Sequence, residues 1–154
     1  MLRAMPSLDP STPASAPRTR RRETCALAVV ATLLLGLASR RWPLAPGIFG
    51  KYPGDALWAA MVFFAWASGR PRARTLHLAL AAGATATVVE FAKLWQAPWL
   101  VELRHTTLGH LVFGHVFSWQ NLGAYALGIL AGCALDPLLA HPRPHRDRAA
   151  IAPR

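Results

Sequence analysis

The sequence has few acidic residues and few cysteines. Seven Asp and Glu stand against 17 Lys and Arg, which gives a formal net charge of +10, and the only cysteines are Cys25 and Cys133. Both cysteines lie in apolar segments without metal-knuckle or redox spacing, so we expect small buried residues and no disulfide. The sequence also lacks a nucleophile elbow, a phosphate-binding loop and a paired-carboxylate signature. These absences exclude the enzyme classes that such motifs define.

Charged residues are almost missing from four long apolar segments, residues 25–39, 56–68, 76–89 and 122–139. The chain is 53% hydrophobic, and its basic residues cluster between these segments. A basic soluble protein would suggest a nucleic-acid partner, whereas this distribution is typical of membrane helices. We therefore predict an all-α integral membrane bundle of four transmembrane helices, and we expect no nucleic-acid partner.

The first apolar segment has a second interpretation. Arg20, Arg21 and Arg22 precede it and Ala38-Ser39 end it, as in a signal peptide with a cleavage site. A helix over 25–39 would rise only about 23 Å, against roughly 30 Å of hydrocarbon. Trp42 at the interface and snorkelling arginines would close part of that gap. Because cleavage would leave an odd number of helices, we interpret the segment as the first membrane helix.

Both ends of the chain are polar and lack apolar periodicity. Residues 1–23 and 140–154 are rich in Pro and Arg, which predicts disordered basic tails on either side of a membrane domain at 24–139. The two tails and the connection at 70–74 contain 12 basic residues, against four in the other two connections. The positive-inside rule then places both termini in the cytoplasm, where the tails can attract anionic lipids.

Glu90 is the most unusual polar residue, because it ends the third apolar segment, where a charge is costly in a bilayer. Lys93 and Gln96 follow at steps of three residues and would form a slanted polar stripe on a helix. An intrahelical Glu90–Lys93 pair is one explanation, and a polar cavity is the other. The predicted topology puts the connections around Glu90 on the outer side, so we predict one polar cluster there: Lys51, Asp55, Glu90, Lys93, Gln96, Arg104 and Asn121.

Several of these positions also have a purely structural interpretation. Asp55 follows Pro53-Gly54 and would lie in the first turn of a helix, where its charge favours the helix dipole. Gly128 and Gly132 are spaced for close helix packing, on the face that also presents Tyr125. Both interpretations of Asp55 stay open at this point.

The connection at 99–118 is too apolar for an ordinary loop, so it is expected to lie in the interface or to re-enter the membrane. Arg104 within it would anchor a phosphate or pair with Glu90. His105, His110 and His115 are five residues apart, a spacing that does not place them on one helical face. We therefore predict no metal site and no cofactor.

Four sequence blocks resemble a known family. They are GKYPGDALW at 50–58, EFxxLxQAPW at 90–99, GHxFxW at 114–119 and AYxLG at 124–128, together with Leu103-Arg104. These blocks are similar to those of DUF2809, a domain-of-unknown-function family of bacterial membrane proteins, whose layout is similar to that of VanZ-like proteins of the cell envelope. The resemblance implies a multi-pass protein of the bacterial inner membrane and brings no established activity. The chain departs from the family pattern at Lys93, where Gln is expected, and at Asn121, where Asp is expected.

Three functions remain open after these observations. The two departures shift the predicted site toward positive charge, which favours an anionic ligand over a metal. The first function is therefore binding or handling of an anionic envelope lipid or lipid-linked precursor. The second is a non-catalytic packing or assembly subunit, and the third is an enzyme that modifies an envelope lipid. Membrane lipids are the expected partners, and a homo-oligomer is compatible with the sequence.

Overall fold

A computed structural model describes residues 18–42, 50, 52–106, 109 and 116–142 of the chain. The described part is nearly all helical, which confirms the all-α prediction. Its helices are α1 (Arg22–Arg41), α2 (Tyr52–Gly69), α3 (Thr75–Ala92), the short α4 (Pro98–His105) and α6 (Trp119–Leu139). Two short strands, β1 (Arg18–Arg20) and β2 (Ala140–Pro142), flank the helices in sequence.

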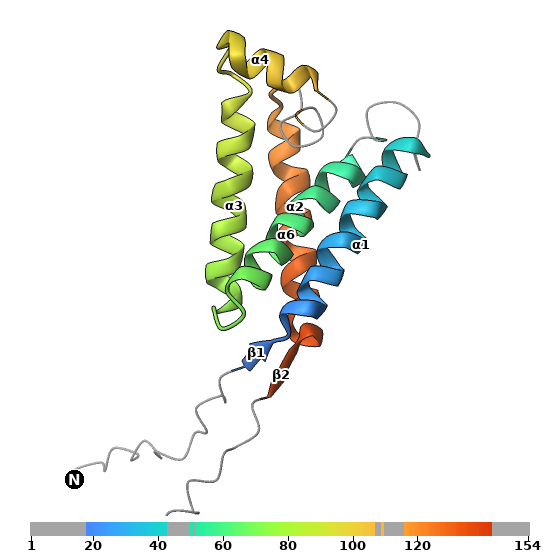
Figure 1. Cartoon of the computed structure of the whole chain (residues 1–154), viewed down its shortest axis with the longest axis vertical. Coiled ribbons are helices and arrows are strands. Elements are labelled where there is room, and N and C mark those ends of the chain that lie inside the picture. Colours follow the sequence, from blue (N-terminus) through green and yellow to red (C-terminus); the bar gives the residue numbers. More distant parts are fainter. Residues whose placement is uncertain (1–17, 43–49, 51, 107–108, 110–115, 143–154) are drawn as a thin grey trace, which may run out of the picture.

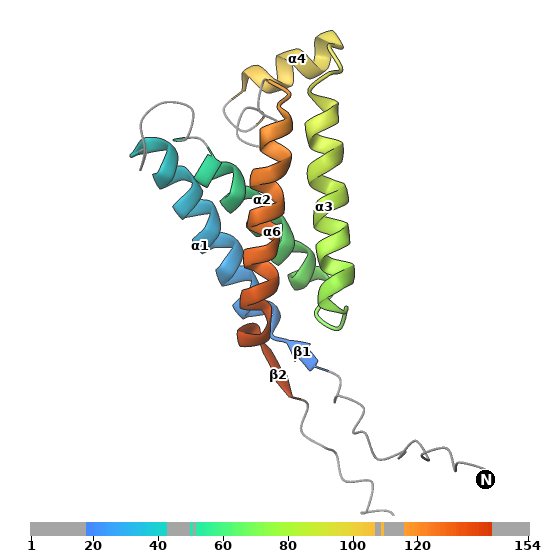
Figure 2. The ribbon, with the colours of Figure 1, turned by 180° about the vertical axis from the view of Figure 1, so that it is seen from behind.

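The four long helices form a bundle in which α2 is central. It packs against α1, α3 and α6, and α6 lies between α1 and α3 when the molecule is seen from behind (Figure 2). Helix α4 lies across one end of the bundle, where α3 ends and α6 begins (Figure 1). We call this the α4 end. The strands and the α2–α3 turn lie at the opposite end, which we call the strand end.

The core surrounds α2 because this helix buries its large side chains. Phe63 and Phe64 are at most 2% exposed and pack in one cluster with Cys25, Leu78 and Ala82. Both cysteines are free thiols in packed surroundings. The contact of α2 with α6 depends on glycine: a Cβ added at Gly128 would lie 1.9 Å from the backbone oxygen of Ala56.

The outer helices expose large apolar side chains, as expected of lipid-facing surfaces. Leu34 on α1, Val88 on α3 and Leu127 on α6 are each at least 60% exposed. These three helices are long and apolar enough to cross a membrane. Helix α2 does not meet the same criterion, because its first turn contains the polar sequence Tyr52-Pro53-Gly54-Asp55. Three of the four predicted transmembrane helices are thus supported, and the chain has the features of a membrane protein.

Ordered structure extends beyond the predicted limits of the membrane domain. Strand β1 lies in the segment predicted to be a disordered N-terminal tail, and β2 lies in the C-terminal one. The strands pair in antiparallel fashion, with Arg18 opposite Pro142 and Arg20 opposite Ala140. Described structure thus lies on both sides of the predicted membrane domain at 24–139, and the buried ion pair of Arg20 described below joins β1 to α6. Residues 1–17 and 143–154 of the tails lie outside the described residues.

Candidate functional site

Glu90, in the last turn of α3, is completely buried and accepts four hydrogen bonds. Its Oε2 accepts from Lys93 Nζ at 2.5 Å and from the Tyr125 hydroxyl at 2.8 Å. Its Oε1 accepts from the backbone N–H of Ser118 at 2.8 Å and from Asn121 Nδ2 at 3.1 Å. We call Glu90, Lys93, Ser118, Asn121 and Tyr125 the Glu90 cluster.

The Glu90 cluster joins the end of α3 to the start of α6. Lys93 is the C-cap of α3, whereas Asn121 and Tyr125 lie one helical turn apart on α6. All three side chains are 5–6% exposed. A buried carboxylate is tolerated when a cation pairs with it and donors satisfy its remaining lone pairs, and both conditions hold here. The cluster therefore fixes the two helices relative to each other at the α4 end.

Two members of the cluster were not among the predicted site residues. Tyr125 follows Asn121 by four residues on the same helical face, and this spacing was a usable sequence signal. Ser118 contributes its backbone N–H. Nearly every residue type has this donor, so the sequence does not indicate it. Asn121 Oδ1 is buried without a hydrogen-bond partner in the described part of the chain.

Arg104 is the second buried cation at the α4 end. It lies in α4, is 3% exposed, and donates from Nη2 to the backbone oxygen of Ala92 at the end of α3. A helix C-terminus carries partial negative charge, which favours a cation there. Its Nε is buried without a hydrogen-bond partner among the described residues. No salt bridge joins Arg104 to a described carboxylate, so the predicted pairing with Glu90 is not seen.

The other predicted members do not all join this cluster. Asp55 lies in the first turn of α2, as predicted, and forms a 3.1 Å salt bridge with Arg40 of α1. Gln96 is exposed, because α3 ends at Ala92 and does not continue to residue 96 as predicted. Its Nε2 donates to the Lys93 backbone oxygen at 3.1 Å. Lys51 lies outside the described residues.

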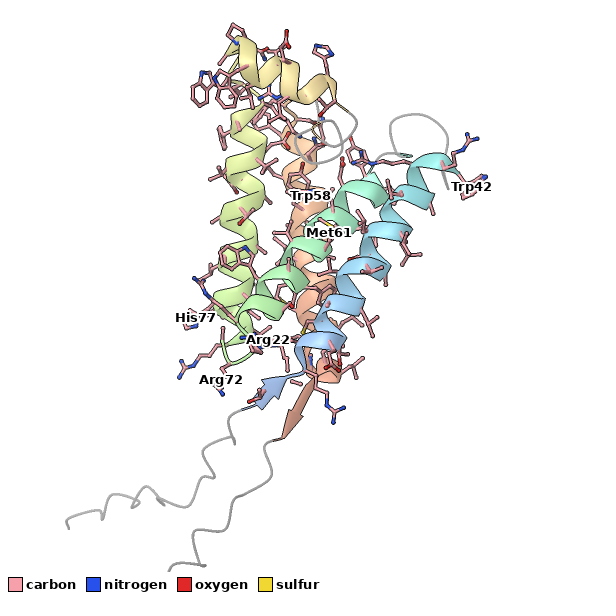
Figure 3. The ribbon with its side chains drawn as sticks, viewed as in Figure 1. Arg22, Trp42, Trp58, Met61, Arg72 and His77 are labelled. Carbon is pink, nitrogen blue, oxygen red and sulfur yellow. The ribbon has the colours of Figure 1, made fainter. Side chains whose placement is uncertain are left out.

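The described residues contain no group of three or more His, Cys, Asp or Glu side chains that could hold a metal ion. His105 ends α4, and His110 and His115 lie outside the described residues, as does much of the connection predicted to re-enter the membrane. A water-sized hollow lies between α1 and α2, and its lining includes Trp58 and Met61. Both residues are labelled on α2 in Figure 3. It is too small for an organic ligand.

A second buried ion pair, which was not predicted from the sequence, lies at the strand end. The guanidinium of Arg20, from β1, donates through Nε and Nη2 to the two carboxylate oxygens of Asp136 on α6. Thr75, at the start of α3, donates its hydroxyl to the same carboxylate at 2.5 Å. The hydrogen bonds to Asp136 raise the pKa of Arg20 above its ordinary value. Asp136 is the only charged residue of the fourth apolar segment. A single carboxylate in such a segment indicates that a buried partner is needed.

The fold and the site define a class of protein: a helical bundle with membrane-type helices and a buried, charge-paired polar cluster at one end. The chain matches the sequence model of the family described as "Protein of unknown function (DUF2809)" over residues 44–129, more than half of its length. The chain therefore belongs to the DUF2809 family, as the resemblance predicted. The match includes the whole Glu90 cluster and Arg104, and it excludes both strands. No solved structure matches the chain.

Proposed function

We propose that this protein is a four-helix integral membrane protein that binds the anionic head group of a cell-envelope lipid or lipid-linked precursor at its α4 end. In this proposal the α4 end faces the outer side of a bacterial inner membrane, and both termini are cytoplasmic. The observation that carries the proposal is Arg104, a buried guanidinium without a described counter-ion.

Several features support the membrane placement. With α2 as the fourth crossing, the helices alternate in direction between the two ends (Figure 1). Four tryptophans at the α4 end are at least 60% exposed, as in the aromatic belt of a membrane interface: Trp42, Trp95, Trp99 and Trp119. The basic residues concentrate on the tails and the α2–α3 turn, which favours a cytoplasmic strand end.

The charges at the α4 end support an anionic ligand. Asp55 pairs with Arg40, and Glu90 pairs with Lys93. The remaining carboxylate there, Glu102, lies exposed on α4 and forms no salt bridge with buried Arg104. An uncompensated buried cation is costly, and a phosphate held by the planar guanidinium would offset that cost. We infer that a lipid phosphate supplies the missing counter-charge.

One observation favours the second candidate, a packing or assembly subunit without chemistry of its own. Both oxygens of Glu90 are occupied by donors from the protein, so Glu90 serves to join helices. The same occupation argues against Glu90 as the general acid or base of a lipid-modifying enzyme, because a proton-transfer group must reach its substrate. In our proposal Glu90 supports the site and Arg104 binds the ligand.

Replacing Arg104 with Gln (R104Q) tests the proposal. Because hydrogen bonds to charged groups contribute about 1.5–3 kcal/mol each, R104Q is expected to weaken anionic phospholipid binding by roughly tenfold to a hundredfold. Arg104→Lys should give an intermediate loss, since it keeps the charge without the bidentate geometry. Native mass spectrometry of the detergent-purified full chain, titrated with phosphatidylglycerol, measures the affinity.

Arg41→Gln is the matched control, because Arg41 is exposed in the last turn of α1 at the same end. It should bind phosphatidylglycerol nearly as well as the natural sequence. If R104Q folds and binds the lipid as tightly as this control, the binding proposal is wrong and the packing subunit is favoured.

A further inference from the structure

The strand end carries an open basic cleft, separate from the Glu90 cluster and from Arg104. It has a volume of about 680 Å³ and lies between β1, the start of α1 and the α2–α3 turn. Its lining includes three exposed arginines and no acidic residue: Thr19, Arg22, Arg70, Pro71, Arg72 and Ala73. Arg22 and Arg72 both lie at this end of the bundle (Figure 3).

Buried Arg20 holds the wall of this cleft in place. Its Nη1 donates to the backbone oxygen of Ala73 at 2.7 Å and to that of Pro71 at 3.3 Å. Its backbone N–H also donates to the Pro71 oxygen at 3.2 Å. The turn that carries Arg70 and Arg72 is thereby fixed to β1 before any ligand arrives, which reduces the ordering cost of binding.

The same contact removes the nearby negative charge. Asp136 is 2% exposed and both of its carboxylate oxygens accept from Arg20. Its charge is therefore compensated inside the protein and does not neutralise the arginines of the cleft. The cleft keeps a concentrated positive charge, which attracts phosphate groups.

The position of the cleft matches the head-group region of a membrane. The Arg70 guanidinium carbon lies 4.8 Å from the ring centroid of Trp66, and the Trp66 indole donates to Thr85 Oγ1 at 3.1 Å. Arginine and tryptophan together are typical of the membrane–water interface. Leu27, just over one turn into α1, is 68% exposed, and Leu76, in the first turn of α3, is 66% exposed. These apolar surfaces suit the acyl chains of a lipid whose phosphate lies in the cleft.

We infer that this cleft binds the phosphate of an anionic glycerophospholipid in the leaflet at the strand end. It is a second lipid site, formed by Arg22, Arg70 and Arg72 and separate from the Arg104 site at the other end of the bundle. It requires that the bundle crosses a membrane and does not require Arg104 to bind anything. Loss of one site is therefore expected to leave the other intact.

The test is native mass spectrometry of the full chain titrated with phosphatidylglycerol, with and without Arg104→Gln so that the two lipid sites are measured separately. It compares two double variants that each remove two charges. Arg70→Gln with Arg72→Gln removes charges that line the cleft. Arg21→Gln with Arg74→Gln removes exposed charges at the same end that do not line it. Both variants lose the same general attraction to a lipid surface, but only Arg70 and Arg72 would contact the phosphate directly, and a hydrogen bond to a charged group contributes about 1.5–3 kcal/mol. The cleft variant is therefore expected to bind at least about tenfold more weakly than the control variant.

Two additional measurements distinguish the possible ligands, and two further variants test the site itself. Millimolar inorganic phosphate should not displace phosphatidylglycerol, and zwitterionic phosphatidylcholine should bind more weakly than phosphatidylglycerol. Arg104→Gln should leave the loss caused by the cleft variant unchanged. Arg22→Gln alone, on the other wall of the cleft, provides an independent check that does not alter the α2–α3 turn.

Equal losses in the two double variants would overturn the inference, because they would indicate attraction to net charge alone. Displacement of the lipid by inorganic phosphate, or by a short oligonucleotide at equal concentration, would also overturn it. The first result would indicate a free-phosphate site and the second a nucleic-acid surface.

Discussion

Replacing Glu90 with Ala (E90A) is expected to destabilise the protein by about 3–5 kcal/mol, because removal of one partner leaves the other charge buried and unpaired. Lys93 is 5% exposed, and its ammonium group pairs with Glu90 at 2.5 Å. The Tyr125 hydroxyl, Asn121 Nδ2 and Ser118 N–H would also lose their acceptor. Thermal unfolding of the detergent-purified full chain measures the loss.

Two further variants make the Glu90 prediction specific. Glu102→Ala removes an exposed carboxylate at the same end and should change stability by less than about 0.5 kcal/mol. Glu90→Ala combined with Lys93→Met removes both buried charges, so it should recover part of the stability lost in E90A. The prediction fails if E90A melts at the same temperature as Glu102→Ala.

Replacing Gly128 with Ala (G128A) is expected to separate α2 from α6. The added Cβ would lie 1.9 Å from the backbone oxygen of Ala56 and 2.7 Å from its carbonyl carbon. Backbone atoms cannot rotate away as a side chain can, so the helices must shift. We expect a loss of about 1–3 kcal/mol or more, the usual cost of overpacking, measured by the same thermal unfolding.

The same helix offers a graded series for comparison. A Cβ at Gly123 meets nothing within 4 Å, so Gly123→Ala should be neutral or stabilising by up to about 1 kcal/mol, because Ala has the higher helix propensity. A Cβ at Gly132 would lie 2.8 Å from Phe63 Cδ1, in a ring that has some freedom to move. Gly132→Ala should therefore fall between the other two variants. Equal stability of G128A and Gly123→Ala would refute the close packing of α2 and α6.

Apolar segments predicted the long helices well, because a bilayer requires long uncharged stretches and leaves few alternatives. The end of α3 was harder to predict. The polar stripe predicted a helix that continues to Gln96, but the helix ends at Ala92 and Gln96 is exposed. Periodicity indicates which face a residue would take if the helix continues, and it does not show where the helix ends.

The candidate site was predictable only where its residues are local in sequence. The Glu90–Lys93 contact, at three residues' separation, follows from helix geometry. The position of Arg104 depends on how α4 lies across the end of the bundle, which is a tertiary feature. The pair of Arg20 and Asp136 joins positions 116 residues apart, and Arg20 lies in a segment without periodicity. Asp136 alone indicated that a partner was needed, and nothing in the sequence identified that partner.

Cysteine accessibility in intact bacterial cells tests the central claim most directly, namely that the bundle crosses the inner membrane with the α4 end outside. The background would carry Cys25→Ala and Cys133→Ala, with one cysteine introduced as Trp99→Cys on α4 or Arg72→Cys in the α2–α3 turn. A membrane-impermeant maleimide is expected to label position 99 in intact cells, and position 72 only after permeabilisation. Labelling of position 72 in intact cells, with position 99 protected, would contradict the account.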